Sequence, residues 1–168
     1  MRRFLSVFDY AADAFIARGL GAGMAGDIVN STNVDYVMSR IRQGYLHDSS
    51  ITLVMIGNCT WSRRYVDWEL QASLRSGPST TPNGVLGIKL PSYVSGQYPE
   101  RLNENLVAPG PLGFLVDCYA RVYDMPSSVD QFVAYLEDAY NARTARAHLI
   151  INPRERLVYN RNCGHPWH

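Results

Sequence analysis

The pattern of apolar positions is clearest in the middle of the chain, where a continuous apolar run, Ile51–Ile56, precedes an amphipathic segment. A run of this length with several β-branched residues predicts a strand that is buried on both faces. The polar stretch Gly57–Thr60 ends the strand, and Ser62 is expected to cap a helix over Arg63–Leu74. One side of this helix is predicted to pack on a sheet, because four residues recur there at helical spacing: Val66, Leu70, Ser73 and Leu74.

Glu69 lies at the border of this stripe. It is displaced by about 100° around the helix from Leu70 and follows Val66 by three residues. A carboxylate in that position is expected to be half-desolvated and to face a groove beside the sheet. The strand, the polar loop and the helix with its bordering acid together predict the floor of a ligand site.

The rest of the chain alternates between strand and helix patterns, which is typical of an α/β fold. Arg3–Tyr10 is predicted as a first strand, and its carboxyl end, Phe8, Asp9 and Tyr10, is expected to face the ligand crevice. The other predicted elements are a short helix over Ala11–Arg18, a helix over Asn33–Leu46, a buried strand over Val85–Leu90, a long loop over Pro91–Gly113, a late strand over Leu115–Tyr123, and a helix over Val129–Ala142 capped by Ser127 or Ser128.

The length of 168 residues corresponds to one domain with a substantial core. We expect residues 1–145 to form this domain. Residues 146–168 are expected to form a C-terminal tail, or a small hairpin about Asn152–Pro153, packed on the same domain.

Composition and charge exclude several classes of protein. The hydrophobic fraction of 46% and the charged fraction of 18% are typical of a soluble globular protein, and a net charge of +1 argues against a dedicated nucleic-acid binder. No apolar run approaches the roughly 20 residues of a membrane helix. Asp9 and Asp13 interrupt the N-terminal apolar residues, so no signal-peptide core is expected. The three cysteines are odd in number and far apart, which favours a reducing cytoplasm.

A glycine-rich segment, Gly19–Gly26, matches the dinucleotide-binding pattern G-x-G-x-x-G as a string. That pattern requires a strand immediately before it and a second strand ending in an acid downstream. Here about ten residues separate the segment from the first predicted strand, and the downstream residues have a helical pattern. A surface loop is therefore favoured over a Rossmann fingerprint.

The block from Ile51 to Leu70 resembles the signature of the TIR-like proteins of Thoeris anti-phage defence. The resemblance rests on a strand ending in Ile56-Gly57, followed by Thr60-Trp61-Ser62-Arg63-Arg64-Tyr65-Val66-Asp67-Trp68-Glu69-Leu70. Phe8-Asp9-Tyr10 is similar to the end of the family's first strand. The likeness extends over about residues 2–142, but the glycine-rich segment and the tail that ends Cys163-Gly-His165-Pro-Trp-His168 match no family feature.

The resemblance implies a three-layer, flavodoxin-like fold with a mainly parallel sheet, and an enzyme that cleaves NAD+ to make a nucleotide signal. It implies that Glu69 is catalytic and that Phe8, Asp9, Tyr10, Asn58 and Trp61 bind the substrate. NAD+ is then a substrate, and neither a resident cofactor nor a metal is expected. The product would act on a separate effector protein, and self-association into a homo-oligomer is left open.

Other interpretations remain open at this stage. Glu69 can form a surface ion pair with Arg63 or Arg64, and Trp61 and Trp68 can be packing residues. Cys59 with His47 can form a nucleophile and base, and Cys163, His165 and His168 can form a metal cluster, although neither set is complete. At the level of the whole chain, the alternatives are a non-catalytic nucleotide- or protein-binding module and a flavodoxin-like electron carrier.

Overall fold

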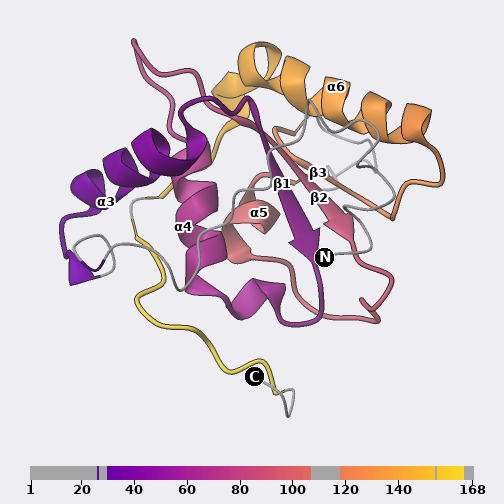
Figure 1. Cartoon of the computed structure of the whole chain (residues 1–168), viewed down its shortest axis with the longest axis horizontal. Helices are drawn as coiled ribbons and strands as arrows, with labels where there is room; N and C mark the ends of the chain where they lie inside the picture. The colour runs from indigo at the N-terminus through magenta and orange to yellow at the C-terminus, as the bar shows by residue number, and fades with distance from the viewer. Residues whose placement is uncertain (1–25, 27–29, 107–117, 154, 165–168) are drawn as a thin grey trace, which may run out of the picture.

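A computed structural model describes residue 26 and residues 30–106, 118–153 and 155–164 of the chain (Figure 1). The predicted first strand over Arg3–Tyr10, the predicted helix over Ala11–Arg18 and most of the glycine-rich segment lie outside the described residues. In chain order, the elements are α3 (Val34–Ile41), the π-helical turn η2 (Arg42–Leu46), β1 (Ile51–Ile56), the 3-10 turn η3 (Thr60–Ser62), α4 (Arg64–Ser73), β2 (Gly84–Lys89), α5 (Glu100–Glu104), β3 (Arg121–Tyr123), α6 (Val129–Ala145) and the 3-10 turn η4 (Ala147–Leu149).

The three described strands form one parallel sheet in the order β1-β2-β3. Ile51 pairs with Gly84 at the start of the β1–β2 ladder, and Leu86 pairs with Arg121 in the β2–β3 ladder. Parallel neighbours require crossover connections, which here contain α4 between β1 and β2 and α5 between β2 and β3. The α/β class with a parallel sheet is therefore confirmed.

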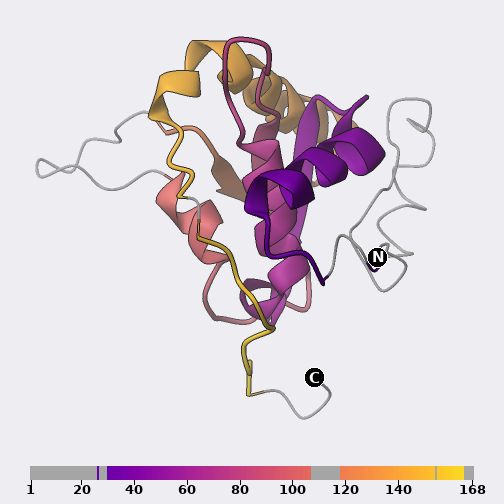
Figure 2. The same ribbon diagram turned by 90° about the vertical axis from the view of Figure 1, so that its left-hand side faces the viewer.

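Helices cover both faces of the sheet, which gives three layers (Figures 1 and 2). On one face, Val54 and Ile56 of β1 share a core with Leu70 and Leu74 of α4 and with Leu102 of α5. On the other face, Leu86 and Ile88 of β2 pack against Phe132 and Ala139 of α6. The helix α3 lies outside α4, where Val37, Met38 and Ile41 pack against Trp68 and Ala72.

The predicted strand over Ile51–Ile56 has the expected bounds, but it is not buried on both faces. Residues of β1 alternate between half-buried and buried, whereas β2 is buried along almost its whole length. The two strands differ in burial because they occupy different positions in the sheet. The strand β2 lies between two neighbours, while β1 has no strand on its other edge within the described part of the chain.

Two other predictions need correction. Ser62 does not cap α4, because it lies in η3 and its hydroxyl donates to the carbonyl of Cys59 at 2.8 Å, while Arg63 occupies the cap position without a side-chain bond. The predicted loop over Pro91–Gly113 contains the short helix α5, which is held by the buried side chains of Arg101 and Leu102. In contrast, Ser128 caps α6 as predicted and accepts from the backbone N–H of Gln131.

Replacement of Gly84 by alanine is expected to destabilise the fold. A Cβ at this position would lie 1.9 Å from the carbonyl oxygen of Ala139, so α6 must move away from β2. Overpacking of this kind costs about 1–3 kcal/mol, which urea unfolding measures directly. Gly77→Ala is the matched control, because a Cβ there meets no atom within 4 Å. Equal stabilities of the two variants would contradict the tight approach of α6 to β2.

The described part of the C-terminal segment, from Ile150 to Gly164, has no regular secondary structure. It runs past α5 and along α4, as Figures 1 and 2 both show. The division of the chain after residue 145 stays a prediction. Within the described ranges, none of the helices has both the length and the apolar character needed to span a bilayer.

Candidate active site

The helix α4 presents successive residues to three different neighbours. Leu70 and Leu74 face the core beneath β1 and β2, and Trp68 and Ala72 face α3. Since each residue turns the helix by about 100°, Glu69 points into the sector between these two groups, toward the space between α3 and β1. The predicted position of Glu69 at the border of the apolar stripe agrees with this arrangement.

The side chain of Glu69 is half-buried, and its carboxylate makes no hydrogen bond or ion pair with any other described residue. The surface pairing with Arg63 or Arg64 is therefore absent. Arg64 instead contacts Tyr65 and the backbone of Val158. Burial disfavours the charged form and raises the pKa of Glu69 from 4.5 to about 7. At neutral pH this carboxyl group is therefore protonated in part of the molecules, and its charged form is poorly screened by water.

A chain of buried side chains fixes the backbone of α4 at Glu69. The hydroxyl of Ser73 donates to the carbonyl oxygen of Glu69 at 2.7 Å and lies 2.6 Å from the hydroxyl of Thr52 in β1. Because the Ser73 proton is used in the first bond, Thr52 is the donor in the second. The side-chain amide of Asn83 completes the chain by donating to Thr52 at 3.4 Å. The backbone carbonyl of Asn83 accepts from the phenol of Tyr119 at 2.7 Å.

Ser73→Ala is expected to lower the free energy of unfolding by about 1–2 kcal/mol, because it leaves the buried Thr52 hydroxyl without its acceptor. Urea unfolding at constant pH measures the loss. Ser79→Ala removes a hydroxyl from an exposed position and serves as the control. If the two variants are equally stable, the chain of hydroxyls does not hold α4 in place.

Asn58 and Trp61 both lie in the segment between β1 and α4, but they face away from Glu69. The carboxamide oxygen of Asn58 accepts from the backbone N–H of Val94 at 3.1 Å, which joins this segment to the loop after β2. Trp61 is half-buried and lines a cavity of about 320 Å³ on the opposite flank of α4, and Glu69 is not among the residues that line this cavity. Phe8, Asp9 and Tyr10 lie outside the described residues.

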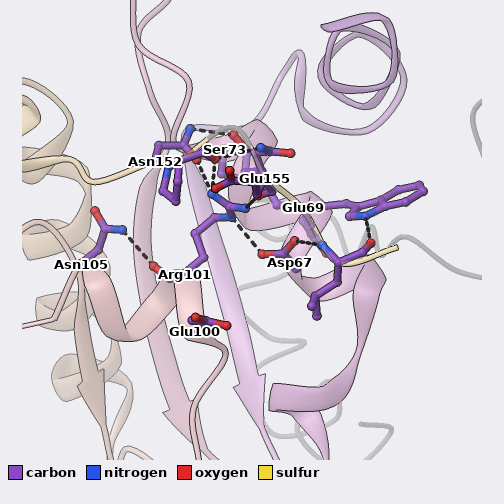
Figure 3. Close-up of polar contacts among 12 residues, drawn as sticks. Asp67, Glu69, Ser73, Glu100, Arg101, Asn105, Asn152 and Glu155 are labelled. Atoms are coloured by element: carbon purple, nitrogen blue, oxygen red, sulfur yellow. Dashed lines mark hydrogen bonds and ion pairs between the residues drawn. The ribbon is translucent and has the colours of Figure 1, made fainter. Parts of the chain in front are cut away.

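The same cavity is lined by charged residues that were not predicted from the sequence (Figure 3). Arg101 of α5 is buried and forms an ion pair with the buried Asp67 of α4, with Nε 3.0 Å from Oδ1. The same guanidinium donates to the side chain of Asn152 and to the carbonyl groups of Pro153 and Glu155. This cluster joins α4, α5 and the C-terminal segment. No sequence spacing marked it, because its members come from three distant parts of the chain.

One disulfide takes up the two cysteines on which the nucleophile and metal alternatives depend. Cys59 forms a disulfide with Cys163, so it is not a free nucleophile. His47 precedes β1 and Cys59 follows it, so a strand of six residues, about 20 Å long, separates the supposed base from the nucleophile. Cys118 is buried and takes no part in this bond. A disulfide is not what the predicted reducing cytoplasm favours. The described residues contain no cluster suited to a metal ion, and His165 and His168 lie outside them.

Comparison with known proteins supports one assignment. The family model described as Thoeris protein ThsB, TIR-like domain, matches residues 11–95, about half of the chain. The matched range includes β1, α4 and Glu69, begins just after Tyr10, and ends before α5. No curated protein and no solved structure matches the chain significantly.

Proposed function

The chain belongs to the family of TIR-like domains of the Thoeris protein ThsB, and from this membership we propose that it cleaves the nicotinamide–ribose bond of NAD+. The product is an ADP-ribose-derived nucleotide that signals in anti-phage defence. Glu69 is the proposed catalytic residue. Phe8, Asp9 and Tyr10 are proposed to orient the nicotinamide and its ribose. The substrate contacts expected of Asn58 and Trp61 are not part of the proposal, because both side chains face away from Glu69.

The observation that supports this proposal most is the environment of Glu69. Its carboxylate is half-buried and lacks a partner among the described residues, and burial raises its pKa to about 7. A structural glutamate would be solvated or paired with a cation, because an unpaired charge costs free energy when it is removed from water. Perturbed carboxylates of this kind are concentrated in active sites.

The chemistry of NAD+ needs a single carboxylate. Ordinary glycosides require an acid that protonates the leaving oxygen and a second carboxylate on the other side. Nicotinamide leaves as a neutral molecule because the nitrogen of its ring is already cationic. The role of Glu69 is to hold the ribose hydroxyls and to stabilise the positive charge that develops on the sugar, and it does so best with few water molecules around it.

The nucleophile that attacks the sugar decides the product. Water gives linear ADP-ribose, whereas an adenine nitrogen held above the anomeric carbon gives a cyclic product. We propose that the product is released in the cytoplasm and binds a separate effector protein. We also propose that the active state can be a homo-oligomer.

The test is to incubate the purified protein with NAD+ and to separate the products by chromatography coupled to mass spectrometry. The wild type is expected to release free nicotinamide together with an ADP-ribose-derived nucleotide, and Glu69→Gln is expected to release neither. Glu137→Gln is the matched control, since Glu137 is exposed on α6. It should retain the wild-type rate.

The same assay distinguishes an enzyme from a binding module. A non-catalytic TIR-like module would bind NAD+ in calorimetry but release no nicotinamide. In cells that express the chain during phage infection, the enzyme would lower the NAD+ content and the Glu69→Gln variant would not. Equal NAD+ levels in the two cultures, together with no turnover in the tube, would contradict the proposal.

A further inference from the structure

The C-terminal strap, which we define as residues 152–153 and 155–164, runs antiparallel to α4 along almost its whole length. Asn152 and Pro153 bond to Gln71 near the end of the helix, and Leu157 bonds to Asp67 and Trp68 in its middle. Val158 and Asn160 accept from Arg64 at the start of the helix. The last contacts lie before the helix, where the N–H of Arg161 donates to Ser62 at 2.8 Å and Cys163 is bonded to Cys59.

The strap buries few apolar groups. Its first half bonds to the buried side chains of Arg101 and Asp67, whereas its second half, from Val158 onward, makes exposed hydrogen bonds to Arg64. None of the residues 155–164 is buried, and Val158 and Tyr159 expose 60% and 78% of their surface. A segment with few buried contacts and solvent-exposed backbone bonds opens locally at low free-energy cost. The covalent bond to Cys59 therefore decides how often the strap leaves α4, because it keeps the end of the strap close to its binding site.

One contact of the strap supplies the side-chain N-cap that α4 lacks. The helix has no side-chain N-cap of its own, since Arg63 occupies the cap position without a side-chain bond. The side-chain oxygen of Asn160 instead accepts from the N–H of Arg64 at 3.0 Å. The first turn of a helix needs such acceptors for its free N–H groups. The strap thus caps, from 96 residues away, the helix that carries Glu69.

We propose that the Cys59–Cys163 disulfide is a redox-controlled clasp, and that its reduction by a cellular dithiol frees the strap and loosens the start of α4. Cys163 is half-buried and lies near the chain end, whereas Cys59 is buried, so Cys163 is the sulfur that a reductant reaches first. In a cytoplasm that contains reducing thiols, a disulfide of this kind is a switch rather than a permanent cross-link.

The exchange reaction is balanced. One thiolate of the reductant attacks the sulfur of Cys163, the S–S bond breaks, and Cys59 leaves as a thiolate that takes up a proton. The second thiolate of the reductant then attacks the mixed disulfide and displaces Cys163, which is protonated in turn. The protein gains two electrons and two protons and becomes a dithiol, while the reductant becomes a disulfide.

The effect on turnover rests on the proposed function, whereas the release of the strap does not. The strap binds the flank of α4 formed by Asp67 and Gln71, and Glu69 points away from that flank. The strap therefore supports the helix without covering the candidate site. Its release is expected to slow NAD+ cleavage, because the first turn of α4 loses its cap and the helix loses its hydrogen bonds to the strap.

The test is amide hydrogen exchange, read by NMR, of the protein purified without reductant, of the same protein after treatment with dithiothreitol, and of Cys163→Ser. The Leu157 amide donates to Asp67 of α4 and the Arg161 amide donates to Ser62 of η3, so both report directly on the strap. Reduction is expected to accelerate their exchange at least about tenfold. Cys163→Ser should exchange fast with and without reductant. Amides of α6 should not change, which shows that the fold is intact.

Thiol titration of the denatured protein accompanies the exchange data. One thiol is expected before reduction and three after it, because the chain has three cysteines and the clasp uses two. Three thiols before reduction, or strap amides that do not respond to reduction, would overturn the proposal.

Nicotinamide release is measured in the same samples. If the amides respond and nicotinamide is never released, the clasp stands and the proposed NAD+ cleavage fails. If the oxidised and the reduced protein release nicotinamide at the same rate, the strap does not control turnover.

Discussion

Glu69→Gln is expected to abolish NAD+ cleavage and, at pH 8, to make the protein more stable than the wild type. The variant keeps the shape of the side chain but removes the negative charge that stabilises the developing cation of the sugar. Loss of one such interaction lowers kcat by about 10²–10³-fold. The gain in stability follows from the same environment, because the amide has no charge to desolvate.

The gain in stability of Glu69→Gln is expected to increase with pH. Burial raises the pKa of Glu69 from 4.5 to about 7 in the folded protein. The stability that comes from protonating this group is therefore fully present below pH 4.5 and is lost as the pH rises through 7. Relative to the wild type, the glutamine variant should gain up to about 3 kcal/mol at pH 8 and much less at pH 5.

Urea unfolding of both proteins at the two pH values measures this difference, with Glu137→Gln as the control that should show none. A constant difference between Glu69→Gln and the wild type at pH 5 and pH 8 would show that the carboxyl group is not desolvated. A variant that is inactive and more stable identifies a residue kept for function at the expense of the fold.

Arg101→Met is expected to destabilise the protein more than any other substitution discussed above. Arg101 and Asp67 are both buried, with exposed fractions of 3% and 8%. Removal of the guanidinium leaves the carboxylate of Asp67 buried without its paired cation, although the N–H of Leu157 still donates to it and the charge of Arg156 is nearby. Breaking a buried pair in this way costs about 3–5 kcal/mol.

Two further variants separate the ion pair from general packing. Arg161→Met removes the partner of Glu100, but this pair is solvent-exposed and should contribute less than about 1 kcal/mol. The double variant Asp67→Asn, Arg101→Met should lose less stability than the sum of the single variants, because no unpaired charge remains. Additive losses would mean that Asp67 and Arg101 act independently.

The sequence alone predicts those parts of the fold that rest on local periodicity. The run Ile51–Ile56 and the spacing of Leu70 and Leu74 define β1 and the buried face of α4, and both agree with the structure. The border position of Glu69 follows from the same spacing. Ser128 also caps α6 as expected, because an N-cap depends on residues only three positions apart.

The remaining features depend on contacts between distant residues, which no local pattern encodes. Cys59 and Cys163 are 104 residues apart, and their pairing required the strap to follow α4. Arg101 lies within the range predicted as a long loop, Pro91–Gly113, and no local pattern marks it as buried. It is buried because Asp67 and the carbonyl groups of the strap surround it. Ser62 was a plausible cap by residue type, but η3 turns its hydroxyl toward Cys59.

The most direct test of the catalytic role of Glu69 is the pH dependence of kcat/KM for nicotinamide release from NAD+, measured from about pH 5.5 to about pH 8.5. If the ionised carboxylate acts on the sugar, kcat/KM rises about tenfold per pH unit below about pH 7 and is constant above it. Glu69→Gln shows no such rise and almost no turnover. A flat profile in the wild type, or a glutamine variant that releases nicotinamide at the wild-type rate, would contradict the role assigned to this residue.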